Sequence, residues 1–220
     1  MPRKYFIIAI LVGLLLLTTR FAKAQTASSP QILITWSAVD SYAPPSYSGK
    51  ILPNQNSPIV ASLEILVGGT PADLSNQTIY WYLNGNLLGG GDGVQRMAFV
   101  DPDDEAPDNL TLEVELPDYP SGLLAQEINI PIVQPIAVID APYPQSEFSE
   151  NPLVVQALPY FFSASSTSPL SFAWSVNGQT VSDAENPQEL QISLPQSTPV
   201  GFAVGITLTV SGPSRCRARL

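Results

Sequence analysis

The stretch that decides the fold is WYLNGNLLGG, residues 81–90, because a shorter echo of it, WSVNGQTV, begins at Trp174. In both copies Asn-Gly follows at the same short distance after the tryptophan. Asn-Gly between apolar strands predicts a two-residue β-hairpin, since both central residues of a type I′ turn need the positive φ that Asn and Gly tolerate. We therefore predict hairpin turns at Asn84-Gly85 and at Asn177-Gly178.

Apolar and polar residues alternate along the segments around these turns. In NLTLEVEL, residues 109–116, every second residue is apolar and faces away from the Thr and Glu residues between. This period of two is typical of antiparallel strands that pack on one side and meet solvent on the other. With 22 prolines and 14 glycines and no helical periodicity beyond residue 24, the predicted class is all-β. The residues that we expect in the core include Trp81, Trp174, Leu112, Val114, Ile192 and Ile206.

The two copies of the motif have matching surroundings, which indicates a duplicated domain. Strands open at Ser57-Pro58 and at Asn151-Pro152, at nearly equal distances before the two tryptophans. Strands centred on Glu113 and Ile206 follow the tryptophans at equal distances. A buried Trp on a central strand followed by a hairpin is typical of an immunoglobulin-like sandwich.

We therefore predict two such sandwiches in tandem, residues 25–134 and 135–220. They meet near IVQPIAV, where a proline is present and a Gly/Ser tract is not. A short joint of this composition predicts a stiff pair.

The copies differ near the C-terminus. The first continues into LLAQEINIPIV, residues 123–133, whereas the second has SGPSRCRARL, residues 211–220, at the matching distance. Three of the five basic residues beyond residue 24 lie within 215–220. We therefore expect the second sandwich to lack its last strand. Two explanations stay open: a truncated or frame-shifted gene product, or an edge that a strand from a partner completes.

Residues 1–24 have the layout of a secretory signal peptide. Arg3 and Lys4 precede an apolar run, and Ala22-Lys23-Ala24 ends it with small residues at the cleavage site. The run is shorter than the ~20 residues of a membrane-spanning helix, so we expect cleavage after Ala24 and no membrane span in the mature chain. An uncleaved membrane anchor is the alternative. The expected location is extracellular, periplasmic or at the cell surface.

Composition excludes several kinds of function. All 19 acidic residues lie beyond residue 24, against five basic ones, so this part carries a net charge of five minus 19, or −14. Such a charge opposes binding to nucleic acid and to anionic lipid. The chain has no His and one Cys, which removes an internal disulfide, His-based triads and ordinary zinc sites. Two carboxylates could still act as a catalytic pair, but no spacing selects one.

Two segments are weak candidates for binding. The acidic segment DPDDEAPD, residues 101–108, offers oxygen ligands for Ca²⁺, although its spacing does not match that of an EF-hand loop. Its candidate ligands are Asp101, Asp103, Asp104 and Asp108. We expect no other cofactor, and a solvated loop is the alternative.

Tyr80 and Tyr82 flank the inward Trp81, so both are expected on one outer sheet face, where tyrosines favour contacts with proteins or sugars. The alternative is that a loop such as SYAPPSYSG, residues 41–49, covers them. LGGGDG, residues 88–93, lacks the Lys-Ser/Thr of a phosphate-binding loop and is predicted to be a turn.

The signal peptide and the W-x-[LV]-N-G hairpins resemble tandem Ig-like or PKD-like modules of bacterial exported surface proteins, although PKD modules usually carry a Trp-Asp-Phe-Gly-Asp-Gly turn. The resemblance implies a non-catalytic structural or binding module of the cell envelope, whose partners are other envelope or surface proteins in protein–protein or adhesive contacts. One alternative is a surface-filament subunit completed by a partner strand. Another is a carbohydrate-active sandwich that uses paired carboxylates.

Overall fold

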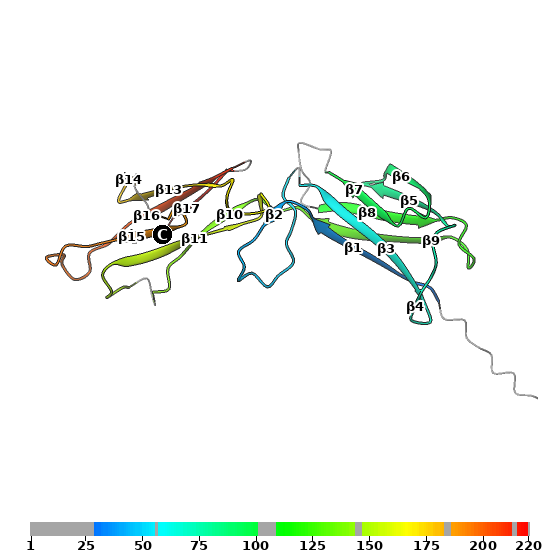
Figure 1. Cartoon of the computed structure of the whole chain (residues 1–220), viewed down its shortest axis with the longest axis horizontal. Coiled ribbons are helices and arrows are strands. Elements are labelled where there is room, and N and C mark those ends of the chain that lie inside the picture. Colours follow the sequence, from blue (N-terminus) through cyan, green and yellow to red (C-terminus); the bar gives the residue numbers. More distant parts are fainter. Residues whose placement is uncertain are drawn as a thin grey trace, which may run out of the picture.

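The protein consists of two β-sandwiches that lie end to end along an elongated molecule (Figure 1). Its computed structural model describes residues 29–55, 57–100, 109–143, 147–182, 186–212 and 215–219. The predicted signal segment, residues 1–24, lies outside these ranges. Every regular element within them is a strand, and no helix there is long and apolar enough to cross a membrane.

The first sandwich packs two antiparallel sheets against each other. In one sheet, the central strand β3 pairs along its length with β1 and on its other side with β7 and β4. The other sheet has the order β6-β5-β8-β9. The strands of the first sheet are β1 (Gln31–Ala38), β3 (Ile59–Val67), β4 (Thr70–Pro71) and β7 (Arg96–Phe99). Those of the second are β5 (Thr78–Leu83), β6 (Asn86–Asp92), β8 (Asn109–Leu116) and β9 (Leu124–Pro131).

The second sandwich repeats this topology, except that its described residues contain no counterpart of β4. Its sheets have the orders β10-β11-β15 and β14-β13-β16-β17, which correspond to β1-β3-β7 and β6-β5-β8-β9. The strands of the first sheet are β10 (Ile136–Asp140), β11 (Leu153–Tyr160) and β15 (Glu189–Ile192). Those of the second are β13 (Ser171–Val176), β14 (Gln179–Val181), β16 (Ile206–Ser211) and β17 (Arg215–Arg219). The predicted all-β class of two tandem immunoglobulin-like sandwiches is confirmed.

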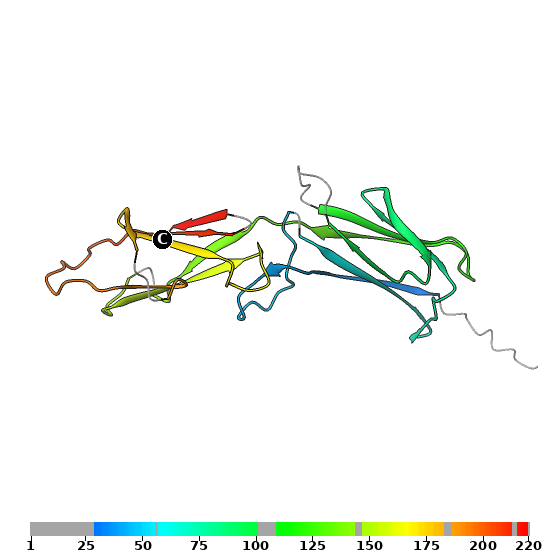
Figure 2. The ribbon, with the colours of Figure 1, turned by 45° about the horizontal axis from the view of Figure 1, so that its top comes forward.

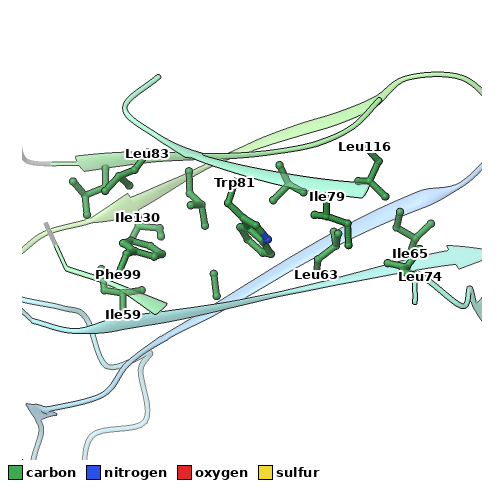
Figure 3. Packing of buried hydrophobic residues seen from close by; sticks show 14 of the residues in the cluster. Ile59, Leu63, Ile65, Leu74, Ile79, Trp81, Leu83, Phe99, Leu116 and Ile130 are labelled. Carbon is green, nitrogen blue, oxygen red and sulfur yellow. The ribbon is translucent and has the colours of Figure 1, made fainter. Parts of the chain in front are cut away.

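Each sandwich is organised around its tryptophan. Trp81 is fully buried between the two sheets of the first sandwich (Figure 3), and Trp174 is 2% exposed in the second. The Nε1 of Trp81 donates to the carbonyl of Val94 at 2.8 Å, and that of Trp174 donates to the carbonyl of Pro187 at 2.9 Å. In both copies the acceptor lies 13 residues further on, just before the strand that joins the opposite sheet. The indole therefore fills the core and also ties the two sheets together.

The structure places the other expected core residues around these tryptophans. Leu112, Val114 and Ile206 are buried. Ile192, at the end of β15, is only partly buried and packs at the margin of the second core.

The repeated asparagine has a structural role beyond the turn itself. Asn84 and Asn177 have φ values of 50° and 48°, and the glycine after each is also in the left-handed region. The Oδ1 of Asn84 accepts from the backbone N–H of Thr111 at 2.9 Å, and that of Asn177 accepts from Gly205 at 2.7 Å. In each sandwich this bond joins the hairpin to the start of the neighbouring strand, β8 or β16. Glycine would supply the φ but not this bond.

The prediction that the second sandwich lacks its last strand is wrong. β17 pairs antiparallel with β16 along its whole length, in the place that β9 occupies beside β8. Strand pairing uses backbone groups, so a change of side-chain composition does not prevent it. β17 therefore occupies the edge of β16 that a partner strand would complete, and its backbone also lies close to β10.

Two further expectations about strands need correction. The strand predicted to be centred on Ile206 begins only at that residue, since Gly201 has a φ of 81° and the chain before β16 is a loop in which Phe202 is half exposed. The predicted turn at residues 88–93 lies mainly within strand β6, which has a bulge opposite Trp81 and Tyr82. Glycine is required within this strand, because a Cβ on Gly90 would overlap the carbonyl oxygen of Ile79.

Replacing Trp174 with Ala is expected to lower the free energy of unfolding by about 3–5 kcal/mol, because it removes a buried indole and orphans the Pro187 carbonyl. Urea unfolding followed by circular dichroism measures this. The control is Val138→Ala on β10, whose side chain is 39% exposed. An equal effect of the two substitutions would contradict the central role of the indole.

Replacing Asn84 with Ala is expected to destabilise the first sandwich by about 2–3 kcal/mol, since Ala is strained at positive φ and accepts no bond from Thr111. Asn84→Gly keeps the permitted φ and loses only the bond, so its loss should be smaller, about 1 kcal/mol. Thermal unfolding of both variants checks this order. A glycine variant less stable than the alanine variant would refute it.

Candidate functional site

The two sandwiches are joined by more than the short linker between β9 and β10. The long connection between β1 and β3 leaves the first sandwich and reaches the second, as the blue segment beside β10 in Figures 1 and 2 shows. Within it, β2 (Ser41–Tyr42) pairs antiparallel with β12 (Phe162–Ser163) of the second sandwich. We call this connection, residues 39–58, the strap. Because β2 and β12 pair through their backbones across the two domains, the strap fixes one sandwich against the other.

Asn54 is the polar centre of the strap. It is 2% exposed. Its Nδ2 donates to the carbonyl of Phe161, and its Oδ1 accepts from the hydroxyls of Ser163 at 2.7 Å and Ser57 at 3.1 Å. The backbone N–H of Asn54 donates to the Ser57 hydroxyl, and its carbonyl accepts from the Ser57 N–H. The buried amide is thus satisfied only when both sandwiches are in place, which makes it a specific lock.

Phe161, the residue that Asn54 holds, has a strained backbone. Its φ of 60° is unusual for a bulky side chain and costs about 1–2 kcal/mol. Its N–H donates to the carbonyl of Tyr42 at 2.6 Å, and its ring meets the ring of Tyr47 edge-on at 5.6 Å. These contacts come from the strap, so the first sandwich helps to hold a strained turn of the second.

Aromatic contacts strengthen the joint, and a cation–π contact holds the strap to β1. Tyr47 also meets Tyr160 edge-on at 5.7 Å. Lys50, on the return leg of the strap, places its Nζ 3.4 Å from the ring centroid of Trp36 on β1, a cation–π contact. Burial raises the pKa of Tyr42 in β2 above its ordinary value. The SYAPPSYSG segment therefore packs at the joint. The alternative, that it covers Tyr80 and Tyr82, would require it to lie on the outer face of β5 instead.

A second feature is the outer face of the β6-β5-β8-β9 sheet in the first sandwich. Tyr80 and Tyr82 are half-buried and alternate with buried residues along β5. Pairing sets Glu115 opposite Tyr80 and Glu113 opposite Tyr82, and Glu127 on β9 lies opposite Glu113. We call these five residues the Tyr-Glu face.

Neighbouring residues leave this face accessible. On β6, Gly90 is opposite Tyr80, so no side chain from that position stands beside this ring. Leu87, opposite Tyr82, is 60% exposed. Desolvation raises the pKa of Tyr82, and the Glu115 carboxylate, to which the Tyr82 hydroxyl donates, raises it further. The face thus combines aromatic surface with negative charge, which suits a cationic partner.

A surface hollow of about 580 Å³ lies on the second sandwich between β10, β11 and the segment after β10. Asp140, Glu147 and Glu150 are among its lining residues, and all three are exposed. A carboxylate pair that cleaves sugars generally includes one acid in a buried, apolar setting. Across the described ranges, no three His, Cys, Asp or Glu side chains are grouped so that they could hold a metal ion.

The calcium candidates Asp101, Asp103, Asp104 and Asp108 lie outside the described residues. The structure places Tyr80 and Tyr82 beside the glutamates of the Tyr-Glu face, which sequence analysis had not connected with them. It also shows two residues that sequence analysis missed, Asn54 and Trp36. For Asn54 the only signal was the unusual length of the segment between the first two long strands, on which it lies.

No protein-family model matches the chain, and a search of curated proteins finds no similar sequence. Among solved structures, the chain is similar to the fibronectin(III)-like modules of Clostridium thermocellum CbhA, with 11% identity over 85% of this chain and 91% of that chain, at a TM-score of 0.28. It is also similar to immunoglobulin domains 1–4 of Sidekick-1, with 11% identity over 88% of this chain and 69% of that chain, at a TM-score of 0.26.

Replacing Asn54 with Ala is expected to loosen the joint, because the Phe161 carbonyl and the Ser163 hydroxyl lose their partner. The two sandwiches of the native chain should share one NMR alignment tensor in residual dipolar coupling measurements, and those of the variant should differ. The stability loss should be about 1–3 kcal/mol. The control is Asn76→Ala, an exposed asparagine that donates to the hydroxyl of its neighbour Ser75. Unchanged tensors in the Asn54 variant would contradict the lock.

Proposed function

We propose that this chain is a non-catalytic, exported module of the cell envelope, a stiff pair of immunoglobulin-like domains that mediates protein–protein or adhesive contacts. The observation that carries this proposal is the strap, with Asn54 buried between the sandwiches. A two-domain chain with only a short linker would by default move at its joint. A buried amide with hydrogen bonds across the joint instead favours one orientation of the two sandwiches, as a spacer or a contact module requires.

Several features support the non-catalytic part of the proposal. Immunoglobulin-like sandwiches commonly serve as contact modules, although fold alone does not determine function. The acids that line the hollow on β10 and β11 are exposed. The Tyr-Glu face has the composition of a contact surface, since tyrosine supplies rigid area with a polar end. We place the chain among bacterial exported surface proteins on the strength of its N-terminal segment and its W-x-[LV]-N-G hairpins.

Export is tested by producing the full chain in a bacterium and sequencing the N-terminus of the product. The expected product begins at Gln25 and lies outside the cytoplasm, because Ala22-Lys23-Ala24 fits a signal peptidase site. The control is a chain from which residues 2–24 are deleted, which should stay in the cytoplasm. A product that keeps residues 1–24 and stays in the cytoplasm would rule out export.

A further inference from the structure

The carboxylates of the Tyr-Glu face repel one another, which is unfavourable for the stability of an isolated chain. Glu113 and Glu127 lie directly opposite each other on β8 and β9, and Glu115 is two positions along β8. Like charges directly opposite on neighbouring strands destabilise a sheet. Among the described side chains, no Lys or Arg lies opposite these three carboxylates in the strand register. A positively charged partner on this face would turn the repulsion into attraction.

The corresponding strands of the second sandwich carry residues of the opposite charge. Along β16, half-buried residues alternate with buried Leu208 and Val210, so the half-buried set belongs to the outer face. The register positions of β17 opposite this set are all arginines, and positions opposite each other in an antiparallel pair belong to one face of the sheet. The pairs are Thr207 with Arg219, Thr209 with Arg217, and Ser211 with Arg215. We call this outer face of the β14-β13-β16-β17 sheet the Arg face.

The other described positions of the Arg face hold no charge that would oppose an acidic partner. The alternate residues of β13 on this side are Ser171, Ala173 and Ser175, and Thr180 of β14 is opposite Ser175. These residues are small and neutral. The Arg face therefore has three arginine positions along one edge of a neutral sheet, and the Tyr-Glu face has three glutamates and two tyrosines.

We propose that the Tyr-Glu face binds the Arg face of a second copy of this chain, so that two copies form an antiparallel dimer. This inference rests on the stiff pairing of the sandwiches proposed above. The β6-β5-β8-β9 and β14-β13-β16-β17 sheets lie toward the same side of the long axis in Figures 1 and 2. If two copies turn these sides toward each other and run in opposite directions, each first sandwich meets the second sandwich of the other copy. One two-fold axis then closes both contacts, and neither face is left to extend a chain of copies.

The chemistry and the size of the faces fit this dimer. Guanidinium groups pair with carboxylates and stack on tyrosine rings, so Arg suits both components of the Tyr-Glu face. Strands are about 4.8 Å apart and rise about 3.3 Å per residue, so four strands of about six residues present roughly 380 Å². The dimer uses four such faces, about 1,500 Å² in total, which lies within the range of about 1,200–2,000 Å² of stable interfaces.

The net negative charge of the chain opposes association only at long range. At an ionic strength of about 0.1 M the Debye length is about 10 Å, so distant charges are screened while groups in contact still attract. At about 1 M the Debye length falls to about 3 Å, and the contact itself weakens. A dimer held by these faces should therefore dissociate when salt rises from the first concentration to the second.

The test is sedimentation velocity of the purified protein with reversed charges. In Glu113→Lys/Glu127→Lys, two lysines replace two glutamates that face each other, so the repulsion within the sheet is kept while the sign of the face changes. In Arg217→Glu/Arg219→Glu the Arg face becomes acidic. We expect the native chain to be a dimer at about 0.1 M salt and each variant to be a monomer. Mixing the two variants should restore a dimer, because one then has two basic faces and the other has two acidic faces.

The control is Glu64→Lys/Asp140→Lys, which reverses two charges at exposed positions of the opposite sheets. It should remain a dimer. A monomeric native chain, variants that remain dimers, or a mixture of the two variants that stays monomeric would each overturn the proposal.

The same samples separate this proposal from the stiff joint. The monomeric variants keep Asn54, so their two sandwiches should still share one NMR alignment tensor. A rigid monomer without self-association would refute the dimer alone, whereas a flexible monomer would refute the stiff pair as well.

Discussion

The arrangement of this molecule depends on one buried amide. The donor and the acceptor of the Asn54 side chain both reach the other sandwich, and the same loop supplies β2 and Tyr47 to the joint. A polar side chain in this position is stabilising only if every group is bonded, since an unpaired buried amide costs more than its bonds contribute. The joint is therefore close to all-or-none. This differs from an apolar interface, which could slide and still bury most of its surface.

The two sandwiches have the same strand order around their tryptophans, and they share one set of polar contacts. The indole N–H of each tryptophan reaches a carbonyl 13 residues on, and the hairpin asparagine of each accepts from the start of the neighbouring strand. These bonds join strands on which the fold of each sandwich depends, so both sandwiches need them whatever residues their outer faces carry. The strap, by contrast, belongs to the first sandwich alone, because the described part of the connection between β10 and β11 forms no strand. The strap thus joins two sandwiches rather than building one.

Sequence analysis could predict the class, the tandem arrangement and the tryptophan cores, since alternation and the repeated Asn-Gly turns are local signals. It predicted neither β17 nor the joint, for physical reasons. β17 is held by backbone bonds, so the sequence RCRAR carries little information about pairing. Asn54 and Phe161 are 107 residues apart, and the positive φ of Phe161 contradicts the preference of its side chain. Such a conformation is set by tertiary contacts, which no local pattern records. For the same reason the neighbourhood of Tyr80, Tyr82 and the glutamates became visible only from the strand register.

The difference between the two outer faces is informative because packing constrains an outer face far less than an inner one. A core position must stay apolar and of similar volume, whereas an outer position of a sheet accepts almost any residue at little cost. Chance alone would mix charges on such a face. Here one sheet has glutamates at adjoining positions of β8 and β9, and the equivalent strands of the other, β16 and β17, have hydroxyl residues and arginines. Like charges are thus gathered on each face, negative on one and positive on the other, although they repel one another within the face. This arrangement is understandable if the two faces bind each other. Because the joint holds both faces in a fixed relation, the energy of two such contacts adds within one complex, and two modest attractions become one specific association.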